Sequence, residues 1–455
     1  MRAWALSTAS ARLLEITVHH LFAQCFLEWG CIGILNRLVA FLLYSSPLPM
    51  STFHTPLLAT TRRSILLLSF ATFSSMVAQR ICDAMLPELS RVFSADLPQA
   101  ARVVWVFAVV YGLAQLVYGP LGDRLGKFRV ITFATLACSI GSLVAVFATS
   151  LEWLVFSRVM VALGAAAIIP LSVAWIGDAV APGQVQETLA RVGLGTTLGV
   201  GAGQLVGGLL TDWLGWRWVF GFMTLLFSLV GLQLFAHGRR QKTSFLNLPG
   251  KRPGQRLAFG TQALHILTGG WSRTVLLVAF IEGGAGFGVL SMWASHLHRV
   301  LGLSLTSAGA IVALYGLGGM LYMAVARPLI RRFGERGLAL LGVCLLGLSA
   351  LLVAYSPYWP PTVVASFLGG FGFFMFHNTM QANATQMAPE ARGTAVSLFA
   401  AALFLGQSVG ALLAANLIER IGSSAVIALG GGVVMLLGVF FAQALRRRAR
   451  LMEPT

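Results

Sequence analysis

Apolar runs of about 20 residues recur along the chain, and short segments that hold most of its charge separate them. Runs of this length predict membrane-spanning helices, whereas an outer-membrane barrel would show alternating segments of about ten residues. The first six helices are expected at 64–87, 101–121, 130–149, 152–175, 192–211 and 217–236. The second six are expected at 274–295, 305–328, 337–356, 361–383, 394–417 and 423–445. The pattern therefore predicts an all-α polytopic membrane protein.

A polar and basic stretch, HGRRQKTSFLNLPGKRPGQR (237–256), separates the two sets of helices. The expected units are an N-terminal extension at 1–60, a six-helix bundle at 61–236, a basic cytoplasmic linker at 237–272, a second bundle at 273–445 and a cytoplasmic tail at 446–455. The run 22–44 contains Glu28 and Arg37, which makes it a poor spanning candidate. We expect translation to start at Met50, so that residues 1–49 are not made; an interfacial amphipathic helix is the alternative.

Composition agrees with a membrane protein and sets its orientation. Hydrophobic residues make up 57% of the chain and charged residues 10%, too few charges to cover a water-facing surface. The net charge of +17 lies in short loops without a nucleic-acid motif, so no nucleic-acid partner is expected. From Met50 onward there are 29 Lys and Arg residues, 22 of which lie on one side of the predicted topology and five on the other. The positive-inside rule then places both ends of the twelve-helix body in the cytoplasm.

The two halves repeat each other. GPLGDRLGKF (119–128) aligns without gaps onto RPLIRRFGER (327–336), and GQLVGGLL (203–210) aligns onto GQSVGALL (406–413). The offsets of 208 and 203 residues differ by no more than a loop. An internal duplication of a six-helix unit follows, which is typical of secondary transporters.

With these motifs the chain resembles the major facilitator superfamily, and within it the twelve-helix drug:proton antiporter group. The loop GPLGDRLGKFR fits that family's signature after the second helix, and Arg158 with Gly164-Ala165-Ala166 fits part of its fourth-helix signature. In the fifth helix Gln204 stands where the antiporter signature has Pro. The resemblance implies two pseudo-symmetric six-helix bundles that work by alternating access, as a monomer.

The resemblance also implies that the charged loop is a conformational latch. A carboxylate is stabilised by the free N–H groups at a helix N-terminus, so Asp123 is expected to contact the start of the eleventh helix when the cytoplasmic side is closed. The neighbouring basic residues are expected to pair with Asp178 or Glu187, or else only to fix topology. The latch residues are Gly119, Asp123, Arg124, Gly126, Lys127 and Arg129.

Ionisable residues inside the apolar runs are candidates for proton coupling, because burying a charge in the membrane is costly. Asp83 is expected to lie between Arg80 on its own helix and Arg158 on the fourth. The alternative to proton coupling is a static ion pair that holds the first and fourth helices together. Glu282 lies mid-span with no basic residue nearby in its helix, which suits a proton carrier or a group that binds cationic substrates. A neutral Glu bonded to a neighbouring backbone is the alternative.

Glycines and polar residues on the helices complete the candidates. A glycine recurs at every fourth residue of the fifth helix, at Gly195, Gly199, Gly203 and Gly207, and predicts close packing with a neighbouring helix. If the series also has a functional role, this face is expected to slide against a helix of the other half during transport. An apolar and aromatic substrate cavity is expected to be lined by Tyr111, Gln115, Gln204, Trp293, Tyr315, His377, Asn378, Gln381 and Gln407.

The sequence predicts a secondary transporter that couples export of a small amphipathic compound to the proton gradient, without a cofactor or metal. No GxxxxGK[ST] loop, metal-ligand cluster or catalytic triad is evident, so no enzyme activity is expected. The alternatives are uptake or facilitated diffusion of a sugar, organic acid or other metabolite, and a membrane receptor or scaffold that does not transport. Short loops and the lack of large soluble additions favour a bacterial inner membrane.

Overall fold

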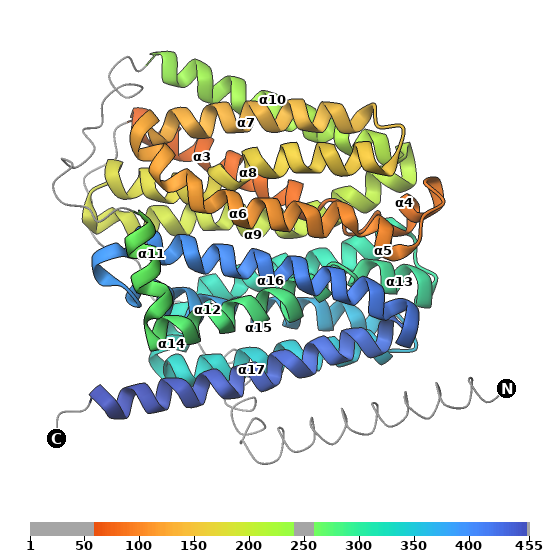
Figure 1. Cartoon of the computed structure of the whole chain (residues 1–455). Coiled ribbons are helices and arrows are strands. Elements are labelled where there is room, and N and C mark those ends of the chain that lie inside the picture. The colour runs from red at the N-terminus through yellow and green to blue at the C-terminus, as the bar shows by residue number, and fades with distance from the viewer. Residues whose placement is uncertain (1–58, 241–258, 453–455) are drawn as a thin grey trace.

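The computed structural model describes residues 59–240 and 259–452, which fold into helices without a strand. Residues 1–58 of the expected extension, 241–258 of the linker and 453–455 of the tail therefore lie outside the described residues. Figure 1 shows the N-terminal half (59–240) lying along the C-terminal half (259–452), with the long helices of both running in the same general direction.

The N-terminal half contains a first helix that ends early, two short helices and five further long ones. Its elements are α3 (Ala59–Arg80), α4 (Leu86–Val92), α5 (Leu97–Ala100), α6 (Arg102–Leu125), α7 (Lys127–Val146), α8 (Leu151–Ala179), α9 (Pro182–Leu214) and α10 (Trp216–Arg240). The turn between α6 and α7 is tight, and Gly126 allows it because its φ of 89° is unfavourable for other residues.

The C-terminal half follows the same order. Its elements are α11 (Phe259–Thr268), α12 (Gly270–Glu282), the π-helix η1 (Gly283–Gly288), α13 (Trp293–Leu301), α14 (Leu305–Tyr355), α15 (Pro360–Gln386), the short η2 (Pro389–Ala391), α16 (Arg392–Ile421) and α17 (Ser423–Met452). The 51-residue α14 is two helices joined at Gly334, whose φ of 62° and ψ of 177° are not helical. It covers the predicted helices at 305–328 and 337–356.

Ten helices of the described chain are long and apolar enough to cross a membrane, and α14 counts once among them. With α14 divided at Gly334 and α3 added, each of the twelve predicted helices has a counterpart. Large apolar side chains point outward along the bundle, including Phe147, which is 73% exposed, and Trp213, which is 77% exposed. Such a surface is stable against lipid tails, and the protein is a multi-pass membrane protein.

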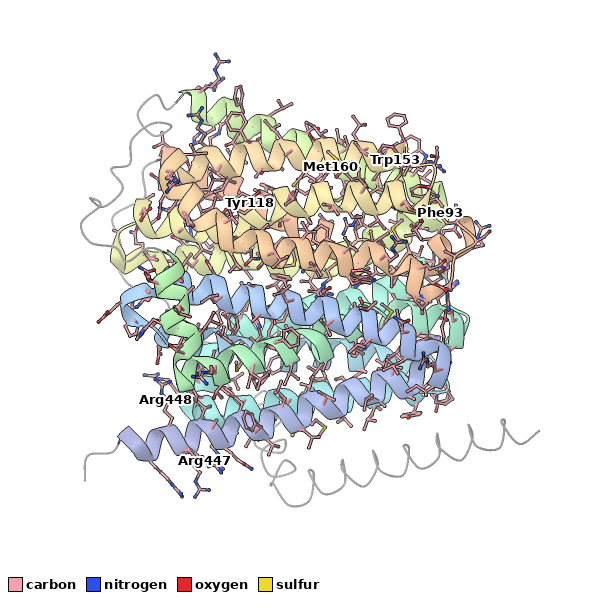
Figure 2. All side chains as sticks on the ribbon, in the orientation of Figure 1. Phe93, Tyr118, Trp153, Met160, Arg447 and Arg448 are labelled. Carbon is pink, nitrogen blue, oxygen red and sulfur yellow. The ribbon has the colours of Figure 1, made fainter. Side chains whose placement is uncertain are left out.

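The two ends of the bundle differ in charge. The basic end is the end that holds Arg239 and Arg240 of α10 and Arg446, Arg447 and Arg448 of α17. Figure 2 shows Arg447 and Arg448 at this end and Phe93 and Trp153 at the other, which we call the far end. The first helix of the described chain begins at the basic end, and α17 returns to it (Figure 1).

The halves meet along two pairs of helices. The fifth helix, α9, packs against α14, and the second helix, α6, packs against α16. Small residues allow both contacts: a Cβ added at Gly201 would lie 2.6 Å from the carbonyl oxygen of Ala313, and one added at Gly112 would lie 3.1 Å from the Cβ of Phe404. Each pair joins the fifth helix of one half to the second helix of the other, as an internal duplication requires.

Candidate functional site

The first helix of each half is interrupted before it reaches the far end. α3 ends at Arg80, and residues 81–85 form turns in which the N–H of Asp83 bonds to the carbonyl of Arg80. Asp83 therefore lies in a break, and the expectation of a continuous helix over 64–87 is wrong there. Broken helices place backbone groups and charges at the midpoint of many transporters.

The break in the first helix holds a buried charged network. Arg80 Nη1 lies 3.4 Å from Asp83 Oδ2, and the Gln204 side chain of α9 donates to the same oxygen at 2.8 Å. Both charged side chains are fully buried. Two charges removed from water in this way need each other, because either one alone is costly in an apolar interior.

The network reaches the other half. Arg80 Nη1 also donates to the carbonyl oxygen of Phe287 at 3.3 Å, and its guanidinium carbon lies 4.1 Å from the centre of the Phe287 ring. One residue earlier, Gln79 donates to the side-chain oxygen of Gln407 on α16 at 3.1 Å. The charged break of the N-terminal half is thus bonded directly to the C-terminal half.

The C-terminal half has a corresponding break. Glu282 ends α12, and the next six residues, GGAGFG, form the π-helix η1. A Cβ added at Gly203 would lie 2.9 Å from the carbonyl oxygen of Val77, and one added at Gly406 would clash with that of Phe280. Both pairs are related by the 203-residue offset of the repeat, which also makes Glu282 the counterpart of Gln79. The duplication predicted from sequence therefore extends to the packing of the first helix on the fifth in each half.

Glu282 has a partner that its own helix could not supply. Oε1 of Glu282 lies 3.2 Å from Nδ1 of His377 on α15. Glu282 is fully buried, while 14% of the His377 side chain is exposed. The His377 ring stacks on Phe373 at 5.5 Å, and Phe373 in turn contacts Phe287 at 4.3 Å between ring centres. Aromatic rings therefore connect the Glu282–His377 pair to the ring under Arg80.

Several buried polar atoms of this region have no hydrogen-bond partner within the described chain. They are Nε and Nη2 of Arg80, Oδ1 of Asp83, Oε1 of Gln204, Oε2 of Glu282 and the hydroxyl oxygen of Tyr315. Buried polar atoms normally have a partner, so a concentration of free ones marks a place where protons, water or a solute can bind. We call these residues together with Gln79, Phe287, His377 and Gln407 the central site.

Arg158 lies beside the expected cluster and bonds to backbone carbonyls. It donates to the carbonyl oxygens of Ala78 at 2.7 Å and Val103 at 3.2 Å, and its guanidinium carbon lies 4.2 Å from the centre of the Phe107 ring. Within the described chain it makes no hydrogen bond to Asp83, whose Oδ2 accepts from Gln204 instead. Arg158 instead ties α8 to α3 and α6 beside the central site.

The charged loop lies at the basic end. Nζ of Lys127 is 2.9 Å from Asp123 and 2.7 Å from Asp178, as expected for a basic residue of this loop. Glu187 pairs with Arg191 of its own helix instead. The hydroxyl of Thr394, at the expected docking place of Asp123, donates to Gln262 of α11 at 2.7 Å. The other loop residues, Gly119, Arg124, Gly126 and Arg129, lie on α6, α7 and the turn between them.

The glycine series of α9 contacts its own half. Cβ atoms added at Gly195, Gly199 and Gly203 would lie within 3.0 Å of α3, and one added at Gly207 would meet the carbonyl oxygen of Ile81. The expected sliding contact of this face with the other half is therefore wrong. Another face of α9 makes that contact: Gly201 approaches Ala313 and Gly208 approaches Leu305. The two groups of glycines lie on different faces of α9, and the sequence did not show which face contacts the other half.

The remaining cavity candidates occupy different environments. Trp293 and Tyr315 are buried with ring centres 6.1 Å apart, in the C-terminal half. Tyr111 is buried with its ring 4.5 Å from Phe404 of the other half, and Gln115 is buried one turn farther along α6. Asn378 is half-buried and Gln381 is exposed on α15. Sequence reasoning missed Gln79, Phe287 and the Glu282–His377 pairing; the repeat offset applied to Glu282 would have pointed to Gln79.

A model of one protein family matches nearly the whole described chain. The match is to the Major Facilitator Superfamily, over residues 68–335 and 275–454. The chain belongs to the Major Facilitator Superfamily. It is thus a transporter of this class, and the twelve-helix fold with two related halves is that of the family.

Relatives of this superfamily member carry resistance names. It is 30% identical over 191 residues to the probable multidrug resistance protein EmrY of Escherichia coli, covering 40% of this chain and 36% of that protein. It is 26% identical over 397 residues to the multidrug resistance protein B homolog of Mycobacterium tuberculosis, covering 74% of this chain and 73% of that one. The chain thus spans about a third of EmrY and about three quarters of the second relative.

Solved superfamily structures share the fold. The crystal structure of the human organic anion transporter MFSD10 (TETRAN) matches with a TM-score of 0.66 at 17% identity, over 85% of this chain and 99% of that one. A peptide transporter, POT, matches with a TM-score of 0.69 at 16% identity, over 86% and 96% of the two chains. At these identities the likeness concerns the fold.

Proposed function

We propose that this protein exports small amphipathic compounds in exchange for protons, by alternating access of a central site. The observation that carries the proposal is the buried pair of Arg80 and Asp83, whose arginine also bonds to Phe287 of the other half. The names of the multidrug resistance relatives support the substrate class. The basic end would face the cytoplasm of a bacterial inner membrane, in accord with the positive-inside rule, and the twelve-helix unit would work as a monomer.

The Arg80–Asp83 pair supplies a route from protonation to movement. While Asp83 is ionised, it attracts Arg80, which also holds the carbonyl of Phe287. A proton on Asp83 removes that attraction and frees Arg80 to move relative to η1. Because Arg80 joins the two halves, binding and release of the proton change the contact between them.

The Glu282–His377 pair supplies a second polar group for the solute. Oε2 of Glu282 has no partner within the described chain, and the Phe373 ring stacks on His377, the partner of Oε1. A buried carboxylate next to aromatic rings suits a solute with one basic or hydrogen-bond-donating group and an apolar body. Glu282 would bind the solute, and Asp83 would carry the proton.

Inside-out vesicles with an acidic interior and a pH-quenched dye test this proposal. Lipophilic cations, neutral antibiotics, sugars and organic acids are added in turn. We expect at least one amphipathic compound to release protons and restore the dye signal with the wild type and the Glu88→Gln control, whose carboxylate lies outside the central site. The response is expected to vanish in Asp83→Asn. Uptake of a labelled compound without proton release, or an unchanged response in Asp83→Asn, would contradict the proposed coupling.

A further inference from the structure

Two carboxylates at the far end bond across the boundary between the halves. Asp212 lies in the last turn of α9, and its Oδ2 accepts from the backbone N–H of Thr306 at 2.6 Å and from the Thr306 hydroxyl at 2.7 Å. Thr306 is the second residue of α14. The carboxylate therefore meets free N–H groups and the positive dipole end of a long helix in the other half.

The second contact runs in the reverse direction. Glu419 lies in the last turn of α16, and its Oε1 accepts from the backbone N–H of Leu97 at 3.2 Å. Leu97 begins the short segment that leads into α6. Here the C-terminal half supplies the carboxylate and the N-terminal half supplies the N–H group.

The repeat relates the two contacts. α9 and α16 are equivalent helices, since both carry the GQxVG motif, and each ends in a carboxylate that reaches the other half. Their partners precede or begin α6 and α14, which are also equivalent. The spacing from the motif is one helical turn longer to Glu419 than to Asp212, so alignment of the repeats alone does not pair them.

We propose that Asp212 and Glu419 form a gate that holds the far end closed, the counterpart of the charged loop at the basic end. This inference rests on the proposed alternating access. Both bonds join the halves, so both must break when the far end opens. Both carboxylates are exposed, so water can replace the bonds and the gate can open at a moderate cost.

Distances between spin labels across the far end measure the gate directly. Labels are placed at Phe147→Cys in the N-terminal half and Tyr358→Cys in the C-terminal half, both exposed and away from the gate. Cys25 and Cys31 are replaced by Ser, and the described cysteines Cys82, Cys138 and Cys344 are buried. Pulsed electron–electron double resonance then measures the distribution of distances between the two labels in the absence of substrate. The short and long distances report the populations with a closed and an open far end.

In the Asp212→Asn/Glu419→Gln variant we expect the ratio of open to closed populations to rise at least about fivefold, since each lost charge weakens one contact with a helix end or N–H group. The Thr306→Val variant keeps the N–H donor and loses the hydroxyl, so a smaller rise is expected; it also serves if the double variant does not fold. Glu152→Gln is the control, because Glu152 pairs with Arg102 within one half at the same end.

Unchanged distances in both gate variants, or an equal change in the control, would overturn the gate. The result separates this inference from the proposed function. Wild-type exchange of protons for a compound with unchanged distances in the gate variants overturns the gate alone. A population shift in the gate variants together with wild-type vesicles that show no flux overturns the proposed transport and leaves the gate.

Discussion

Gln204 donates a hydrogen bond of 2.8 Å to Asp83 and so joins the fifth helix to the break in the first. The same carboxylate oxygen faces Arg80, which holds the carbonyl of Phe287 in the other half. Two helices of the N-terminal half, α3 and α9, thus meet at one buried oxygen, and Arg80 connects this oxygen to the other half. The transport proposal depends on this arrangement, and four predictions test parts of it.

Asp83→Leu should destabilise the protein more than the double variant Arg80→Met/Asp83→Leu. The single change leaves a buried guanidinium without its counter-charge, which costs about 3–5 kcal/mol, whereas removing both charges avoids that cost. Thermal unfolding in detergent measures the difference. Equal unfolding temperatures of the two variants would show that the pair is not buried as a unit.

Gly201→Ala should slow transport, because its Cβ would lie 2.6 Å from the carbonyl oxygen of Ala313 and would push α9 away from α14. Overpacking of this kind costs about 1–3 kcal/mol. Gly177→Ala is the matched control, since a Cβ there meets nothing within 4 Å. Vesicle flux should fall in the first variant only. Equal flux in both variants would mean that the α9–α14 contact can accommodate an added methyl group.

Glu282→Gln and His377→Asn should be non-additive in stability. The two side chains are 3.2 Å apart, and contacting residues usually show a coupling of about 0.5–3 kcal/mol. A double-mutant cycle of unfolding free energies measures this coupling. Additive effects would indicate that the two groups act separately and that His377 does not position the carboxylate.

Lys127→Met should lower the transport rate while changing stability by less than about 1 kcal/mol. Lys127 joins Asp123 to Asp178, and both acids are half exposed, so the bonds are weak. If the loop is a latch, losing its central cation changes the balance of conformations. Arg240→Met, at the same end but outside the charged loop, is the comparison. Equal transport rates in both variants and the wild type would indicate that the basic residues of the loop only set the membrane topology.

The break in the first helix shows how far sequence reasoning reached for the central site. Asp83, Arg80 and Glu282 were recognised because charge is rare in apolar runs, and that rarity is visible in one dimension. Phe287 and Gln79 were not recognised, since a ring and an amide are common there. Phe287 belongs to the site because its backbone carbonyl accepts from Arg80. Gln79 belongs to it because its amide bonds to Gln407, which lies more than 300 residues away in sequence.

The sequence by itself determined the number of helices, the division into two related halves and the basic end. These follow from the lengths of apolar runs, from repeated motifs and from loop charge, all of which are local along the chain. Only the tertiary structure decided which face of α9 meets the other half, where the first helices break and which carboxylates cross the boundary. Such contacts depend on how whole helices pack, and helices of similar apolarity on every side leave their rotation open until their neighbours are in place.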